Sequence, residues 1–244
     1  TRSIFKTLRR ERECYKQFDR IVCVSENVKR SFESLFNIKQ NITVLYNPVD
    51  RERIIEESKK PVDLPSKTNI RLCSVGRLAE QKGYDRLLRV HKRLLEEGIA
   101  HELWILGEGP ERPRLESYIE QNRLGESVRL LGFKPDPYSW MGQCDLFVCS
   151  SRAEGFSTAV TEALILGMPV ITTDCSGMKE LLGDHGEYAI VTENSEEAFY
   201  AGLRSLLIAP KQLDHYRRQS VLRGHEFGLE KTLPAIERLL AGEM

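Results

Sequence analysis

Two glutamates, Glu154 and Glu162, lie eight residues apart across a short turn that contains glycine and serine. A strand-like apolar run over 146–149 precedes them, and helix-forming residues begin at Thr158. A strand that leads through a turn into a helix directs backbone N–H groups at an anion beyond the sheet. We therefore interpret this segment as an anion site, with phosphate as the expected anion.

A second cluster follows the strand-like run over 70–75 and contains Gly76, Arg77, Lys82 and Gly83. A forked guanidinium and an ammonium at one turn could hold a diphosphate and stabilise it as a leaving group. A glycine at the start of the turn lets the backbone bend tightly. On these residues alone, the favoured interpretation is two solvated charges on a surface loop.

The two glutamates differ in their expected roles. Glu154 precedes the turn and is expected to face the crevice at the strand ends, whereas Glu162 lies early in the helix and could accept hydrogen bonds from a vicinal diol. A carboxylate near a helix N-terminus is also stabilised by about 0.3–1 kcal/mol by the helix dipole alone. That effect explains one glutamate, but it does not explain a pair with a small-residue turn between them.

Strand-like and helix-like segments alternate strictly from residue 70 onward. The predicted strands cover 70–75, 102–106, 128–131, 146–149, 169–172 and 188–191, and the predicted helices include 110–121, 137–141, 178–182 and segments beginning at 158 and 195. This alternation predicts an α/β fold with a doubly wound parallel sheet, Rossmann-like, and helices on both faces. Ligands of such sheets bind beyond the carboxyl ends of the strands, where both clusters lie.

The first 60 residues do not fit as the start of that sheet. We predict a basic helix over 2–17, a strand within 18–25, a helix over 26–36 and a strand over 42–46. A polar stretch with two prolines follows between residues 59 and 69, as in a linker. We therefore predict two regions, 1–60 and 61–244.

Composition excludes several classes of function. The chain has 244 residues, is 41% apolar and balances 36 basic against 36 acidic residues, so no net field attracts nucleic acid. Six cysteines without a Cys-x-x-Cys pair are typical of reduced thiols in a cytoplasmic protein, and neither they nor the five histidines have metal-ligand spacing. We expect no metal and no nucleic-acid partner.

The N-terminal helix is basic and carries a rough apolar stripe, formed by Ile4, Leu8, Tyr15 and Phe18. Such a helix could lie on a membrane surface or meet a lipid-linked acceptor. More often, such a helix packs its stripe on its own domain and leaves its charges in water.

The two clusters, together with the segments around them, resemble the donor-binding half of retaining glycosyltransferases of family 4 of the bacterial polysaccharide type, which have the GT-B fold. The resemblance runs from about Phe18 to the C-terminus. It implies a metal-independent enzyme, of hexosyltransferase type, that transfers sugar with retention from a UDP- or GDP-linked donor to a saccharide or lipid-linked acceptor. No other cofactor is implied.

The same resemblance implies that residues 1–60 are the end of the acceptor-side domain and the crossover linker, and that residues 61–244 are the donor domain. On this expectation the N-terminal part of the acceptor domain is missing and the chain alone is inactive. The enzyme would work in the cytoplasm, at the inner face of the membrane.

Residue by residue, the resemblance assigns Arg77 and Lys82 to the donor phosphates, Glu154 to the transferred sugar and Glu162 to the ribose. Catalytic roles are implied for Glu154, Arg77 and Lys82. The whole implied donor site comprises Gly76, Arg77, Lys82, Gly132, Phe133, Glu154, Gly155, Phe156, Ser157, Thr158 and Glu162. The serine and threonine replace smaller or apolar residues usual in the family, and Phe133 could equally belong to the core.

Two alternatives remain open at this point. The first is a nucleotide-sugar epimerase on the same architecture, which would scramble its substrate without an acceptor. The second is a non-catalytic nucleotide-sugar binding module that needs a partner chain.

Overall fold

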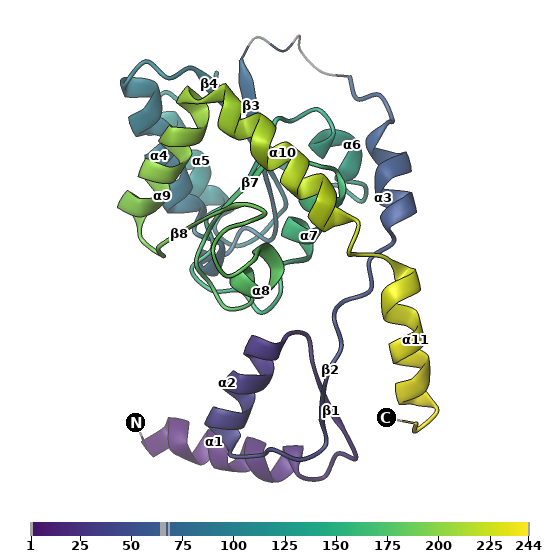
Figure 1. Cartoon of the computed structure of the whole chain (residues 1–244). Coiled ribbons are helices and arrows are strands. Elements are labelled where there is room, and N and C mark those ends of the chain that lie inside the picture. Colours follow the sequence, from purple (N-terminus) through teal and green to yellow (C-terminus); the bar gives the residue numbers. More distant parts are fainter. Residues whose placement is uncertain (1, 64–66, 68, 244) are drawn as a thin grey trace. The chain divides into compact units, whose positions relative to one another are not determined.

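The computed structural model describes residues 2–63, 67 and 69–243, and side chains from residue 6 onward (Figure 1). These residues divide into two compact units. Unit one comprises 1–48 with 229–244, and unit two comprises 49–228. The predicted regions 1–60 and 61–244 concern the domains of a longer enzyme and stay a prediction.

In the described part of unit two, six parallel strands form one sheet in the order β5-β4-β3-β6-β7-β8. Their bounds are β3 Ile70–Val75, β4 His101–Leu106, β5 Val128–Gly132, β6 Leu146–Cys149, β7 Val170–Thr173 and β8 Ile190–Thr192. The first of these strands along the chain, β3, lies in the middle of the sheet. β4 and β5 follow on one side of it, and β6, β7 and β8 follow on the other side. This order confirms the predicted doubly wound parallel sheet.

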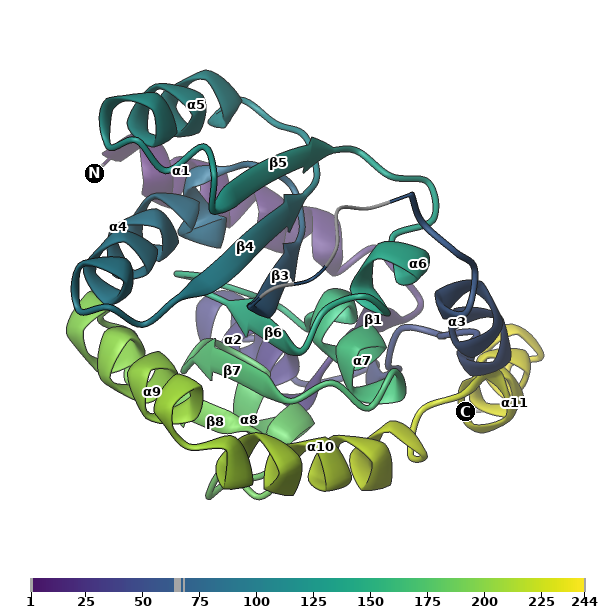
Figure 2. The same cartoon turned by 90° about the horizontal axis from the view of Figure 1, so that it is seen from above.

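Helices cover both faces of this sheet, and Figure 2 shows α4 and α9 on one side with α6 and α7 on the other. The helices of unit two are α3 Arg51–Ser58, α4 Tyr84–Glu96, α5 Arg112–Gln121, α6 Tyr138–Met141, α7 Thr158–Ile165, α8 Met178–Leu182, α9 Glu196–Ile208 and α10 Pro210–Gly224. A short 3₁₀ turn, Glu80–Lys82, precedes α4.

Successive side chains of a strand point to opposite faces of the sheet, so the core has one layer on each face. Leu72 and Leu103, both fully buried, pack in one cluster with apolar residues of α4 and α9. Trp104, the next residue on β4, is 1% exposed and its ring lies 6.1 Å from that of Trp140 in α6. Alternation with a period of two therefore buries both faces of the strand.

The sequence did not predict α3. Its N-terminus is capped by Asp50, whose side chain accepts a hydrogen bond from the backbone N–H of Arg53 at 3.0 Å. Ile54, 2% exposed, packs with Val49 and with Ile165 of α7. The helix is thus held mainly by tertiary packing against α6 and α7.

Unit one contains α1 Arg2–Tyr15, α2 Glu26–Phe36 and the parallel strand pair β1 Ile21–Cys23 and β2 Ile42–Val44, and its last element is α11 Leu229–Leu240. Tyr15 of α1 packs its ring against Phe32 and Phe36 of α2, with centroid distances of 4.8 and 4.9 Å. These contacts join the two helices. Across the described residues, no helix is both long and apolar enough to cross a membrane.

Candidate functional site

A cavity of about 400 Å³ opens at the carboxyl edge of the sheet in unit two. It contains four of the predicted site residues, Gly76, Arg77, Phe133 and Glu162. Its other lining residues are Val75, Leu106, Gly107, Glu108, Lys134 and Pro137. The lining therefore includes an arginine from the β3 turn and a glutamate from α7.

Close contact between two strand-end turns forms the wall that carries Arg77. Gly107, at φ 142°, lies so near the β3 turn that a Cβ atom there would be 1.9 Å from the carbonyl oxygen of Gly76. The backbone N–H of Leu78 also donates to the carbonyl of Glu108 at 2.9 Å. Only glycine fits at position 107, because its φ is unfavourable for other residues and no room exists for a side chain.

Arg77 has no ion pair or side-chain hydrogen bond within the described part of the chain. Most arginines around the sheet are occupied; Arg86 and Arg152, for example, bind backbone and side-chain oxygens. An unpaired guanidinium on a cavity wall is a suitable donor for a phosphate, which it can bind with two parallel hydrogen bonds.

Lys82 and Glu154 are bound to each other. The Nζ of Lys82 lies 2.6 Å from Oε1 of Glu154, and the hydroxyl of Ser151 donates to the same oxygen at 2.5 Å. The two side chains are 20% and 8% exposed. Because β3 and β6 are neighbours in the sheet, residues 72 positions apart meet where these strands end. The lysine charge is therefore balanced within the site.

Four further contacts hold the Lys82 turn against the segment that follows β6. The hydroxyl of Ser150 donates to the carbonyl oxygens of Lys82 and Gly83, at 3.0 and 3.1 Å. A Cβ atom on Gly83, whose φ is 66°, would lie 2.2 Å from the carbonyl oxygen of Ser150. The backbone N–H of Arg152 donates to the carbonyl of Gln81 at 2.6 Å.

Arg86 of α4 binds the same segment and is 5% exposed. Its guanidinium donates to the carbonyls of Ser150 and Ser151 at 2.7 and 2.5 Å, and to the side chain of Asn194 at 2.8 Å. Burial is the largest influence on the pKa of Arg86 and lowers it. No carboxylate pairs with Arg86 among the described side chains. Its positive charge is therefore stabilised by oxygen dipoles of the site segment.

Arg152 belongs to the same segment and forms a bidentate pair with Asp85, at 2.7 and 2.8 Å. Burial raises the pKa of Asp85, but the hydrogen bond and charge of Arg152 outweigh it, so that the pKa lies well below its usual range. Asp85 thus stays ionised and is occupied by Arg152, which leaves it no part in ligand chemistry.

Glu162 lies in the second turn of α7 and reaches the cavity wall. The hydroxyl of Tyr138 donates to its Oε1 at 3.0 Å. Burial raises the pKa of Glu162, while the hydrogen bond from Tyr138 lowers it. The carboxylate can accept further hydrogen bonds from a ligand in the cavity.

The remaining predicted residues surround these side chains. Phe133 is 70% exposed at the cavity, and Gly132 before it has φ 74°, a conformation that favours glycine. Phe156 is 9% exposed and Ser157 5% exposed. The serine hydroxyl accepts a hydrogen bond from the backbone N–H of Val160, so its side chain caps α7.

Thr158 is exposed as the first residue of α7, and Gly155 is exposed in the turn before it. The carbonyl of Gly155 lies close to Gly177, where a Cβ atom would be 2.5 Å away. The predicted site as a whole stays a prediction.

Sequence reasoning missed several residues of the site. Glu108, Lys134 and Pro137 line the cavity, Tyr138 holds Glu162, and Ser151 holds Glu154. Their place after strands β4, β5 and β6 was the one available signal, because a hydrogen bond between distant residues leaves no pattern in the sequence. Of the His, Cys, Asp and Glu side chains that the structure describes, no three are grouped to hold a metal ion.

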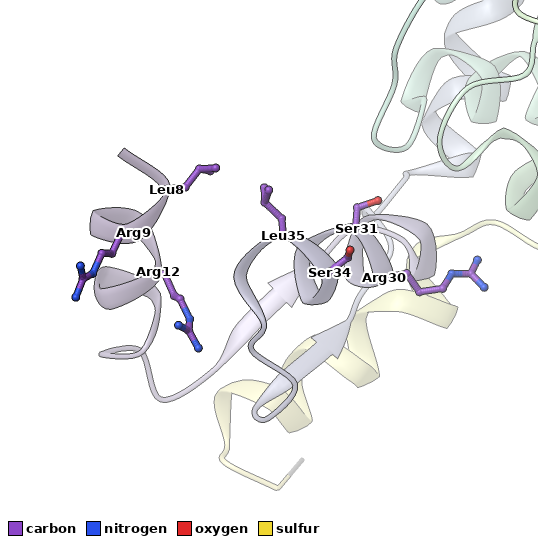
Figure 3. Close-up of a pocket in the computed structure, with 7 residues that line it drawn as sticks. All are labelled: Leu8, Arg9, Arg12, Arg30, Ser31, Ser34 and Leu35. Carbon is purple, nitrogen blue, oxygen red and sulfur yellow. The ribbon is translucent and has the colours of Figure 1, made fainter. Parts of the chain in front are cut away.

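A second cavity, of about 1110 Å³, lies between α1 and α2 of unit one. It is lined by Leu8, Arg9, Arg12, Arg30, Ser31, Ser34 and Leu35. Figure 3 shows Leu8 and Leu35 pointing toward each other across the gap, whereas the three guanidiniums point in different directions. The arginines therefore do not converge on one point, as they would at a site for a single small anion.

Comparison with known proteins gives two family matches. The family described as "Glycosyl transferases group 1" matches residues 54–221, and "Glycosyltransferase Family 4" matches residues 2–53. Both matches confirm the resemblance found in the sequence.

Among curated proteins, a Campylobacter jejuni N-acetylgalactosamine-N,N'-diacetylbacillosaminyl-diphospho-undecaprenol 4-alpha-N-acetylgalactosaminyltransferase is 34% identical over 206 residues. That match covers 82% of this chain and 55% of the relative. An uncharacterized glycosyltransferase of Methanocaldococcus jannaschii is 28% identical over 93% of this chain and 64% of its own length. The chain thus spans somewhat over half the length of these relatives.

Solved structures show the same fold. The Anabaena protein HepE, in complex with UDP and glucose, aligns with a TM-score of 0.84 at 19% identity, over 97% of this chain and 67% of the other. The pneumococcal O-GlcNAc transferase GtfA, in complex with UDP and GlcNAc, aligns with a TM-score of 0.81 at 18% identity, over 96% and 47%.

Proposed function

Because this chain belongs to the group 1 glycosyl transferases of family 4, we propose that it binds a nucleotide-diphosphate sugar and serves as the donor side of a transferase. One observation carries the proposal: Arg77 and Glu162 line the same cavity. A nucleoside diphosphate offers an anion at one end and a ribose diol beside it. These two groups require a cation and a hydrogen-bond acceptor in one cavity.

In this assignment the base lies at Phe133 and Lys134, the ribose diol donates to Glu162, and the diphosphate lies at Arg77. The sugar lies at Glu154, beside Lys82. Lys82 and the N-terminal amides of α7 supply further positive charge at the diphosphate. Each predicted group then has a chemical counterpart on the donor.

The proposed reaction breaks the bond between the sugar anomeric carbon and the diphosphate. The departing diphosphate gains negative charge, which Arg77 and Lys82 stabilise, so that no metal ion is required. Glu154 lies where positive charge develops on the sugar ring, and its carboxylate stabilises that charge. The acceptor hydroxyl oxygen bonds to the anomeric carbon as the diphosphate leaves, its proton passes to the departing diphosphate, and the configuration of the sugar is retained.

We propose that the acceptor is a saccharide or a lipid-linked saccharide and that the transferred sugar is a hexose. Transfer needs the acceptor held in line and water excluded, which a donor domain alone does not provide. Since the chain spans 55% and 64% of two curated relatives, we expect it to bind donor without transferring sugar at an appreciable rate.

Calorimetry of the 244-residue chain with UDP, GDP and ADP, with the corresponding nucleosides and with the nucleotide sugars tests the proposal. We expect one nucleoside diphosphate to bind clearly more tightly than the corresponding nucleoside, because the phosphates meet Arg77. Failure of all three to bind would contradict the proposal. Incubation with labelled donor and a crude acceptor extract tests the expected lack of transfer. The same incubation without acceptor tests the epimerase alternative, because an epimerase would convert the donor sugar into its epimer.

We also propose a peripheral membrane contact for unit one, at the inner face of the membrane. Lys6, Arg9 and Arg10 are exposed on α1, and Leu35 of α2 is 57% exposed. Dispersed cations with apolar side chains between them suit anionic lipid head groups better than a single anion (Figure 3). Cosedimentation with phosphatidylglycerol vesicles, and its loss with phosphatidylcholine alone, would support the contact.

A further inference from the structure

Tyr138 contacts the carboxylate of Glu162 without itself lining the cavity. Its hydroxyl lies 3.0 Å from Oε1 of Glu162, and among the described residues it is the one hydrogen-bond partner of that carboxylate. Glu162 lies on the cavity wall, whereas Tyr138 is absent from the residues that line the cavity. The tyrosine therefore binds one carboxylate oxygen from outside the cavity and leaves Oε2 for a ligand within it.

The backbone and the ring of Tyr138 are both held in place. Its backbone N–H donates to Oδ1 of Asp136 at 3.0 Å, at the start of α6. Its ring packs against the buried cluster of Val49, Ile54 and Ile165. Because that cluster joins α3 to α7, the ring is fixed between two helices and its hydroxyl has a defined direction.

The hydrogen bond also acts on the charge of Glu162. Burial raises the pKa of this carboxyl group, and the Tyr138 hydroxyl opposes that rise. A carboxylate that receives one fixed hydrogen bond is both more stable as an anion and restricted in rotation about its last torsion. Such a group is preorganised to accept two hydroxyls of a diol.

We propose that Tyr138 is a positioning residue for ribose recognition: it orients Glu162 so that the carboxylate accepts the 2′- and 3′-hydroxyls of the donor nucleotide. This inference rests on the proposed function, because it requires that the cavity binds a ribonucleotide. Tyr138 itself touches no ligand and acts entirely through Glu162.

A merely structural role for Tyr138 predicts a different result. If its hydroxyl only satisfied a buried carboxylate, its loss would change the stability of the chain but would affect all nucleotides alike. A positioning role weakens only ligands that carry the diol. Nucleotides with and without the 2′- and 3′-hydroxyls therefore separate the two roles.

The test compares wild type with Tyr138→Phe, which keeps the packed ring and removes the hydroxyl. Calorimetry with the 244-residue chain uses UDP, GDP and ADP and the 2′,3′-dideoxy form of each. Tyr200→Phe is the matched control, because the Tyr200 hydroxyl also donates to a glutamate, Glu97, and neither residue lines the cavity. Thermal unfolding of each variant reports the structural effect.

We expect wild type to bind the ribonucleotide at least about tenfold more tightly than its dideoxy form, as is usual for hydrogen bonds to a charged group. Tyr138→Phe should weaken the ribonucleotide about fivefold and the dideoxy form less than about twofold. Tyr200→Phe should leave both unchanged. In a Glu162→Gln background, Tyr138→Phe should no longer alter the ratio.

The outcomes are distinct. If wild type prefers the ribonucleotide and Tyr138→Phe keeps that preference in full, the positioning role is overturned and the proposed function stands. The positioning role is also overturned, and the proposed function also stands, if Tyr138→Phe lowers the ratio of ribonucleotide to dideoxy affinity further in the Glu162→Gln background. If wild type binds none of the three ribonucleotides, or binds one without regard to its diol, the assignment of the ribose to Glu162 fails and this inference fails with it.

Discussion

Lys82 and Glu154 form a 2.6 Å ion pair at the predicted sugar end of the site. A donor diphosphate would compete with Glu154 for the ammonium of Lys82, and the carboxylate would repel the approaching phosphates. The ion pair therefore stabilises both charges when no ligand is bound. It also lowers the affinity for a diphosphate. The glutamate is retained, in our proposal, for its effect on the transferred sugar.

Glu154→Gln should accordingly separate binding from transfer. With the carboxylate removed, Lys82 is free for the phosphates, so the affinity of the 244-residue chain for the nucleoside diphosphate should stay equal or rise. Sugar transfer by the complete enzyme should fall by at least about a hundredfold, if the carboxylate stabilises the developing charge. Calorimetry and a transfer assay measure the two effects. Loss of nucleotide affinity with normal transfer would contradict the assignment.

Arg77→Ala should weaken nucleoside diphosphate binding by about 1.5–3 kcal/mol, because a charge-assisted hydrogen bond is lost. The variant should unfold at the same temperature as wild type, since Arg77 has no side-chain partner within the described residues. Arg114→Ala is a matched control: Arg114 is exposed and pairs with Glu111 on the surface of α5. If Arg77→Ala kept full affinity, the phosphate would have to lie elsewhere.

Arg86→Met should lower the free energy of unfolding by about 2–4 kcal/mol. The variant removes the Arg86 donor to the carbonyl of Ser150 and one of three donors to the carbonyl of Ser151, which keeps Thr173 and Cys175, although methionine fills similar space. Ser150 and Ser151 lie just before Glu154 in the chain, so the loss of their contacts should displace Glu154. Sugar transfer by the complete enzyme should therefore fall more than nucleotide affinity. Urea unfolding measures the first effect. A variant as stable as wild type would show that the segment is held by its other contacts alone.

The parallel sheet could be predicted because its signal is local. Each strand from β3 to β7 is a run of four to six largely apolar residues, and an amphipathic helix follows most of them. α3 was missed because its eight residues contain only two apolar side chains, Ile54 and Ile55. Its stability comes from packing against α6 and α7, which no local pattern reveals.

The same distinction applies to the site. Strand ends in a parallel sheet lie along one edge, so Arg77, Phe133 and Glu162 could be expected near one another. The sequence could not predict that Lys82 would pair with Glu154, since both were assigned to ligand and their contact depends on side-chain geometry. Nor could it predict that Tyr138 would reach Glu162, 24 residues away.

A buried histidine pair should make the chain unstable in mild acid. Nδ1 of His91 lies 2.8 Å from Nε2 of His101, and Nε2 of His91 lies 2.9 Å from the hydroxyl of Ser127. One ring must donate to the other, so protonation of both would place two N–H groups against each other. Burial lowers the pKa of His91 from 6.5 to about 3 and also lowers that of His101.

The sign of the pH effect follows from these shifts. Below pH 6.5 the unfolded chain binds protons that the folded chain excludes, so the free energy of unfolding falls as the pH falls toward 3. Each excluded proton contributes a slope of at most about 1.4 kcal/mol per pH unit. Urea unfolding between pH 7.5 and 5 isolates the histidines, because carboxyl groups titrate mainly below this range. His91→Gln should be less stable at pH 7.5 but should show a smaller slope, and an unchanged slope would refute the role of this pair.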